Sequence, residues 1–206
     1  MVTLKPHRVD RVNNNTPVLF NNEIDAYAHA ILADYKPELL QEASIINYEH
    51  FLESYLGMRI DFQDLYSDDP ERPILAMTAF RRCKVRVFDK ENECVEKITV
   101  PARTVIIDNS LLKQGRECLA LFSALHEGGH ITMHWHVYTG ETLDGREYDA
   151  DCEFSDELFP YVCCRRKILK AVGVKTKSVP PKNGESIMLI ILPPLLLCLM
   201  PHSNRL

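Results

Sequence analysis

The spacing of apolar residues divides the chain into helical and strand-like stretches. Residues 22–32 place apolar side chains at helical spacing behind an expected Asn cap at Asn22, and residues 48–56 do so before Gly57, a residue type common just past a helix end. Residues 115–137 predict a longer helix. Shorter alternating or apolar runs predict strands at 58–62, 74–80, 84–88, 96–100 and 103–107, with a hairpin turn at 89–93. This order predicts an α+β fold with N-terminal helices and a small, mostly antiparallel sheet.

The chain has room for one hydrophobic core, since 206 residues are typical of a single domain. We expect a loose lead-in over residues 1–21, the domain itself over residues 22–170, and an aberrant apolar tail over residues 171–206. The apolar run of the tail is broken by Pro193 and Pro194 and is too short to span a membrane. No membrane partner is therefore expected.

Charge and cysteine content narrow the function classes. The chain has 24 basic and 29 acidic residues and so a net charge of -5. This charge does not predict a basic surface that would bind phosphates. Direct binding of nucleic acid is therefore not expected. The seven cysteines are an odd number, and the N-terminus has no apolar signal core, so we expect free thiols in the cytoplasm.

Two histidines lie four residues apart in the long predicted helix, within His126-Glu127-Gly128-Gly129-His130. At this spacing both imidazoles project from one face and can reach one tetrahedral zinc ion. Glu127 points about 100° around the helix, toward a metal-bound water rather than the metal. The pattern predicts that His126 and His130 bind zinc and that Glu127 is the general base of a hydrolysis. The alternative is a helix in which the histidines occur by chance.

Three neighbouring residues modify this prediction. Gly128 and Gly129 each disfavour a helix by about 1 kcal/mol relative to Ala, so we expect them to let another backbone or a substrate strand approach. His134 lies about 12 Å along a straight helix from His126, too far to share one ion. We therefore expect His134 to act behind the ligands or at the surface, and a third ligand to come from elsewhere.

With the motif placed, the chain resembles the ImmA/IrrE family of metallopeptidases. The resemblance runs from about Ile46 to His134 and rests on the helix ending at Gly57, on residues 104–112, and on residues 125–130 followed by His134. It implies zinc ligation by His126 and His130, a general base at Glu127, and a third ligand, a glutamate, from a later helix. It also implies a protein substrate such as a helix-turn-helix repressor.

The helix expected to hold the third ligand is missing from the printed residues. Plausible codons for residues 183–202, read from the third base of each, give WREHHADYFAAA, two undetermined residues, and MPNATF. This string contains the Glu-x-x-Ala-Asp-x-Phe-Ala-Ala pattern of the family helix. We therefore interpret residues 171–206 as frameshifted. Glu185 lies within about one residue of the expected ligand position, although one helical residue rotates a side chain by about 100°. It is our candidate third ligand.

Acidic side chains in residues 149–157 are the alternative ligands, and they are more typical of a solvated loop. The sequence thus predicts a zinc-dependent metallo-endopeptidase whose activity in this particular chain is weakened or lost. The alternative is a non-catalytic regulatory module that binds its partner without cleaving it.

Overall fold

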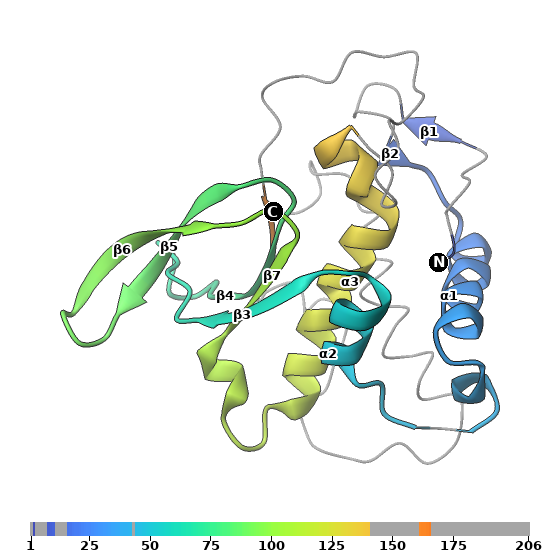
Figure 1. The fold of residues 1–206 in the computed structure, drawn as a ribbon, viewed down its shortest axis with the longest axis horizontal. Helices are drawn as coiled ribbons and strands as arrows, with labels where there is room; N and C mark the ends of the chain where they lie inside the picture. The colour runs from blue at the N-terminus through green and yellow to red at the C-terminus, as the bar shows by residue number, and fades with distance from the viewer. Residues whose placement is uncertain (1, 3–7, 11–15, 43, 141–160, 166–206) are drawn as a thin grey trace.

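The structure is a computed structural model that describes residues 2, 8–10, 16–42, 44–140 and 161–165. It has a mixed α/β architecture, in agreement with the predicted α+β class (Figure 1). Strands and helices follow one another as β1 (Val9–Asp10), β2 (Thr16–Pro17), α1 (Asn21–Tyr35), the 3-10 helix η1 (Pro37–Leu40), α2 (Tyr48–His50), the π-helical turn η2 (Phe51–Tyr55), β3 (Arg59–Gln63), β4 (Ile74–Ala79), β5 (Cys83–Asp89), β6 (Cys94–Val100), β7 (Thr104–Asp108), the 3-10 helix η3 (Asn109–Leu112), α3 (Glu117–Thr139) and β8 (Tyr161–Arg165).

The N-terminal helix α1 begins two residues before the expected start, and its cap differs from the prediction. The N-cap is Phe20, which has no side chain able to accept a hydrogen bond, and not Asn22. The Glu23 carboxylate compensates by accepting a 2.7 Å hydrogen bond from the Phe20 backbone N–H. The short strands β1 and β2 pair antiparallel within the stretch expected to be a loose lead-in.

The main sheet has the strand order β3-β7-β4-β8. β3 and β7 pair in parallel, whereas β4 pairs antiparallel with both β7 and β8. The predicted mostly antiparallel sheet therefore contains one parallel pair, and it gains β8, a strand that the apolar pattern did not predict. β4 and β7 lie inside this sheet, and their side chains are almost all buried.

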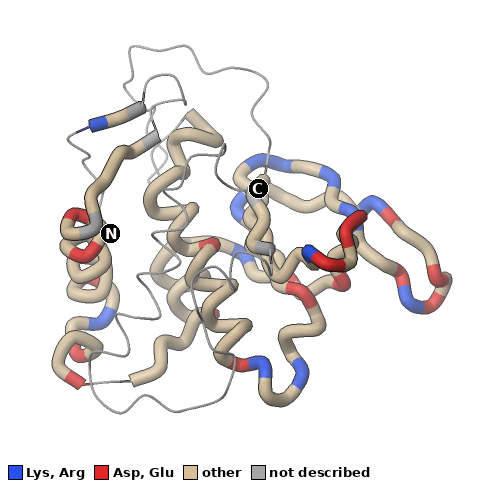
Figure 2. The backbone as a smooth tube through the Cα atoms, turned by 180° about the vertical axis from the view of Figure 1, so that it is seen from behind, with Lys and Arg blue, Asp and Glu red and all other residues tan. Residues whose placement is uncertain are grey.

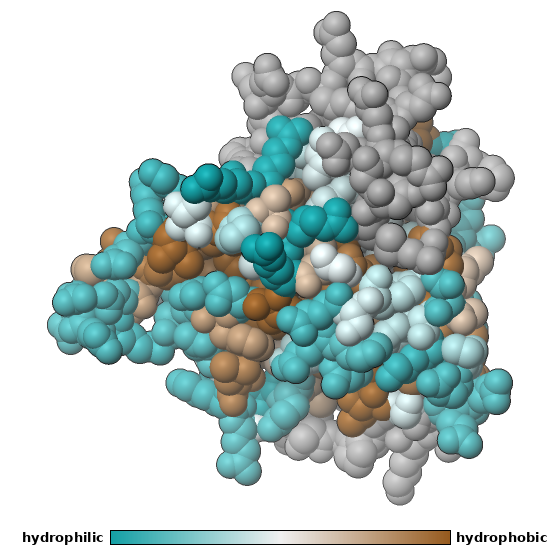
Figure 3. Space-filling model, in the orientation of Figure 1, coloured by the Kyte–Doolittle hydropathy of each residue, from teal (hydrophilic) through white to brown (hydrophobic). Residues whose placement is uncertain are grey.

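A separate hairpin of β5 and β6 extends from the body of the molecule (Figure 1). Its turn lies in residues 89–93, as predicted, and the Asp89 carboxylate accepts hydrogen bonds from the backbone N–H groups of Glu91 and Asn92. Lysine, arginine and acidic residues gather along this hairpin, whereas α3 is nearly free of charge (Figure 2). On the surface, the hairpin is largely hydrophilic toward its tip (Figure 3).

The long helix α3 is the centre of the hydrophobic core. It stands between α1 and the sheet (Figure 1), and it contacts β4, β7 and β8. On the α1 side, the Tyr27 hydroxyl donates a 3.1 Å hydrogen bond to the Thr132 carbonyl. Burial on both sides explains why α3 is apolar nearly all round its circumference. Any polar side chain on α3 that faces the sheet must therefore find its partners inside the protein.

Among the described residues, no helix combines the length and apolar character needed to cross a membrane. The five cysteines in the described ranges are free thiols, and Cys83 and Cys164 are buried.

Candidate functional site

Three of the four histidines of α3, namely His126, His130 and His134, form a line of contacting imidazoles. The Nε2 atoms of His126 and His130 are 3.2 Å apart, and their rings stand nearly perpendicular at 84°. The Nδ1 atom of His130 lies 3.2 Å from Nδ1 of His134. All three side chains are buried. His134 is thus not a surface residue: it contacts the other nitrogen of His130.

Glu127 follows His126 on α3, and its side chain faces the sheet. Its side chain has no exposed surface, and its Oε2 accepts a 2.6 Å hydrogen bond from the hydroxyl of Thr78 on β4. Thr78 is likewise fully buried. A strand residue therefore holds the carboxylate in one orientation beside the histidines. The apolar pattern placed Thr78 in a strand but gave it no role.

Two further polar residues complete this buried cluster. Ser123 comes one helical turn before Glu127, and Cys164 comes from β8; both are fully buried. Burial, and next the negative charge of Glu127, raise the pKa of the Cys164 thiol well above its usual value, while the Ser123 hydroxyl acts in the opposite direction. Ser123 lies three residues before His126 and four before Glu127, so helical spacing could have identified it from the sequence. Cys164 could not be found in this way, because only strand pairing brings it here.

The glycines of the motif face away from this cluster. A Cβ atom at Gly128 would lie 3.0 Å from Cε1 of Phe51, a residue of η2. The close approach at Gly128 is therefore made by a side chain of the protein itself, and not by a substrate strand as expected. Gly128 and Gly129 also line a small apolar hollow with Ile31, Phe51 and Leu125. This helix face serves packing.

The geometry of His126 and His130 fits a zinc ion. Two imidazole nitrogens that share a tetrahedral zinc, each about 2.05 Å from the metal, lie about 3.3 Å apart. The 3.2 Å separation of the two Nε2 atoms is close to this value. It also fits an N–H···N hydrogen bond between a donor ring and an acceptor ring. The donor set and its spacing thus suit zinc without requiring it.

No third donor joins these two nitrogens within the described ranges. Three residues whose side chains could together bind a metal ion do lie close to one another in these ranges: Asp89, Cys94 and Glu96, at the turn of the β5–β6 hairpin. Its Asp89 oxygens already bind the turn, and the other two residues are exposed, so the hairpin turn explains their proximity. Glu185 and the alternative carboxylates of residues 149–157 lie outside the described residues.

Comparison with known proteins adds no assignment, because no family model, curated protein or solved structure matches the chain.

Proposed function

We propose that this protein is a zinc-dependent metallo-endopeptidase of the ImmA/IrrE type. One observation carries the proposal: two imidazole nitrogens 3.2 Å apart on a buried helix, with a carboxylate on the next residue. Burying three imidazoles and a carboxylate in an apolar interior is unfavourable unless each is paired or bound to a metal. A dication between His126 and His130 would offset the negative charge of Glu127.

Each residue of the cluster has a role in this proposal. His126 and His130 would hold zinc, which when bound supplies an acidified water and a Lewis acid for the scissile carbonyl. The Glu127 carboxylate accepts the proton of the attacking water and returns it to the leaving amine. Thr78 orients Glu127 by its hydrogen bond. His134 orients the His130 ring through Nδ1, the position at which a metal-binding histidine usually contacts a carboxylate, a backbone carbonyl or water.

The third ligand remains a prediction from the sequence. Glu185 occupies the nearest printed position, and the glutamate of the alternative frame is the family-like donor. Two protein ligands hold zinc weakly, so the printed chain would bind it less tightly than a chain with the alternative frame restored.

The resemblance proposes a protein substrate, such as a helix-turn-helix repressor. With a net charge of -5, the chain would reach DNA only through that partner. Free thiols at Cys83 and Cys164 favour a reducing compartment, in keeping with the proposed cytoplasmic location.

Zinc content tests the proposal most directly. In the frame-restored protein, His126→Ala and His130→Ala should each lose stoichiometric zinc, measured by mass spectrometry of metals, while His29→Ala on the exposed side of α1 should keep it. Glu127→Gln should keep zinc but lose peptide hydrolysis, since an amide cannot accept the water proton. Unchanged zinc in both histidine variants would refute the metal site.

A non-catalytic binding module is the second candidate function. It is favoured by the complete burial of Glu127 and the near-complete burial of His126 and His130, which leaves no surface of the cluster for substrate in this conformation. A frame-restored protein that binds a repressor without zinc and without cleavage would support this candidate.

A further inference from the structure

Strand β8 occupies the edge of the sheet nearest the candidate site. It pairs antiparallel with β4, with Cα partners Thr78↔Val162 and Ala76↔Cys164. β4 is the strand whose Thr78 holds Glu127, so β8 lies next to the strand that lines the site. It is the short orange segment beside β4 and β7 in Figure 1.

The two faces of β8 contact different parts of the protein. Tyr161 and Cys163 pack with Met77 in the smaller hydrophobic cluster between the sheet and the hairpin. Cys164 belongs to the opposite face, as do its β4 neighbours Ala76 and Thr78, because side chains alternate along paired strands. This face is turned toward α3, and it brings the fully buried Cys164 to Ser123 and Glu127.

This placement closes the site from the sheet side. Cys164, Thr78 and Glu127 all have no exposed surface. The attacking water must contact the Glu127 carboxylate beside the substrate carbonyl, and neither can reach that position while these side chains are packed together. In addition, β8 pairs with the backbone of β4 along the edge where an extended peptide could add as a strand.

β8 can leave without breaking the rest of the sheet. Like β3, it lies at an end of the strand order, so its departure leaves the β3-β7-β4 pairs intact. Local opening of an edge strand requires less free energy than global unfolding.

We propose that β8 is a built-in inhibitory strand, which closes the candidate site in the resting protein and must separate from β4 before a substrate can enter. This inference rests on the proposed function, because it gives the regulation of that same site. Cys164 is the side chain that seals Glu127 in the closed state.

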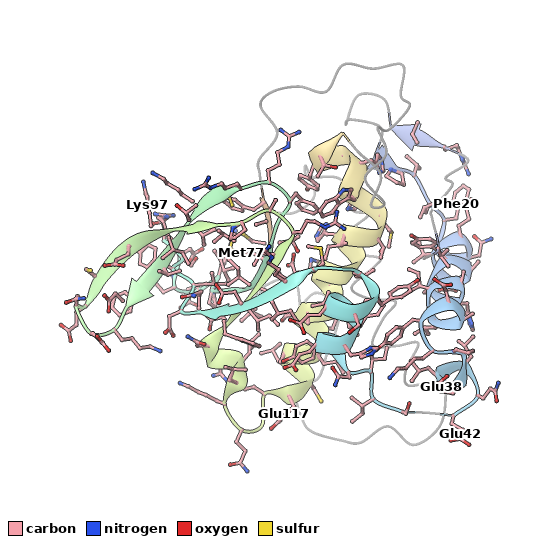
Figure 4. The ribbon with its side chains drawn as sticks, in the orientation of Figure 1. Phe20, Glu38, Glu42, Met77, Lys97 and Glu117 are labelled. Atoms are coloured by element: carbon pink, nitrogen blue, oxygen red, sulfur yellow. The ribbon has the colours of Figure 1, made fainter. Side chains whose placement is uncertain are left out.

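A reversible disulfide between β4 and β8 tests the inference in the full chain. Met77, labelled in Figure 4, lies on β4 directly opposite Cys163. Opposite residues of antiparallel strands have Cα atoms about 4.5–5.5 Å apart, within the range that a disulfide spans. Met77→Cys should therefore form a disulfide with Cys163 under oxidising conditions, and peptide mapping would establish that pairing. The reduced form of the same variant is the matched control.

Access to the histidines is the first measurement, and it needs no bound metal. Diethyl pyrocarbonate should modify His126 and His130 about tenfold or more slowly in the oxidised form than in the reduced form, because local opening is then blocked. The exposed His29 should react equally in both forms. Equal rates at His126 and His130 would overturn the inference.

A second variant tests the same inference if the disulfide does not form. Cys163→Pro places a residue without an N–H group in β8 and should weaken its pairing with β4. Modification of His126 and His130 should then be faster than in the unaltered chain, with His29 unchanged. No acceleration would overturn the inference.

Zinc uptake and peptide hydrolysis separate this inference from the proposed function. If the frame-restored Met77→Cys protein binds zinc, and hydrolyses peptide only in its reduced form, the result supports both the proposed function and the inhibitory role of β8. Equal hydrolysis in the two forms overturns the inhibitory strand alone. Blocked histidine access without any zinc binding in the reduced form overturns the proposed function, and with it the inhibitory role of β8.

Discussion

Glu127 is held inside the protein by a short hydrogen bond from Thr78, and this contact can be tested at the scale of single residues. Thr78→Val keeps the shape of the side chain but removes the donor, leaving a buried carboxylate oxygen without that bond. We expect a loss of about 1–3 kcal/mol in the free energy of unfolding, measured with urea at neutral pH. Thr78→Ser retains the hydroxyl and should lose much less. Equal losses would mean that packing, not the hydrogen bond, determines the effect.

Single residues also mark the limit of prediction from sequence. His126, Glu127 and His130 were identified because their spacing along one helix fixes their relative positions. Thr78 and Cys164 come from two strands whose pairing depends on the whole sheet, so no local pattern joins them to the motif. His134 was not predicted to share the ion of His126, and its contact with His130 and its burial place it inside the protein.

At the scale of elements, the contact between α3 and η2 depends on Gly128. The Phe51 ring packs edge-on to Tyr35 at 5.1 Å and stacks on Tyr55 at 5.5 Å, so it has little room to yield to a Cβ atom. Gly128→Ala gains about 1 kcal/mol of helix propensity but should lose about 1–3 kcal/mol by overpacking. We expect a net destabilisation of about 1 kcal/mol in urea unfolding.

Phe51→Leu supplies the matched background for this prediction. A shorter side chain makes room for the added methyl group, so Gly128→Ala should be much less destabilising in the Phe51→Leu protein. A penalty of the same size in both backgrounds would show that the cost arises elsewhere.

The β5–β6 turn makes a pH-dependent contribution to stability. Hydrogen bonds from the Asn92 side chain, and then from the Asn92 and Glu91 backbone, lower the pKa of Asp89. Because the folded pKa lies below the unfolded one, this contribution is complete above the unfolded pKa and is lost as pH falls through the folded value. Asp89→Ala should lower the thermal unfolding midpoint at neutral pH, and the difference from the unaltered chain should shrink in acid.

Glu91→Ala, in the same turn, is the control for this hairpin prediction and should leave the midpoint nearly unchanged. A difference for Asp89→Ala that persists unchanged through acid pH would show that the Asp89 carboxylate charge is not its source.

Element type and order followed well from apolar periodicity, but strand pairing did not. The strands predicted at 58–62 and 103–107 correspond to β3 and β7, which pair in parallel, while β4 joins the same sheet on the other side of β7 and β5 and β6 form a separate hairpin. β8 was missed because its five residues are short and lack a clear alternation. The prediction that Asn22 caps α1 was wrong, because the Glu23 side chain in the first turn accepts the hydrogen bond from the Phe20 backbone N–H.

At the scale of the whole molecule, the frame hypothesis predicts a paired change in two properties. As printed, residues 187–200 form a nearly continuous apolar run, so the chain should be poorly soluble. Restoring the alternative frame should replace this run with an amphipathic helix that carries a carboxylate. Solubility and zinc occupancy should then rise together when the two versions are expressed side by side.

The printed chain is itself the control in that comparison. If it proves equally soluble and equally loaded with zinc, the frameshift interpretation is wrong. Glu185 or one of the carboxylates of residues 149–157 must then be the ligand.

The pairing of β4 with β8 has a consequence for folding of the protein during its synthesis on the ribosome. About 80 residues separate the two strands, and translation at about 5–20 residues per second needs roughly 4–16 s to supply the second after the first. Once β7 and α3 have been made within that interval, the nascent chain carries β4 with one open edge beside an apolar helix until β8 follows. Such edges pair readily with other chains. The speed at which the codons after α3 are read should therefore influence how much of the newly made protein escapes aggregation.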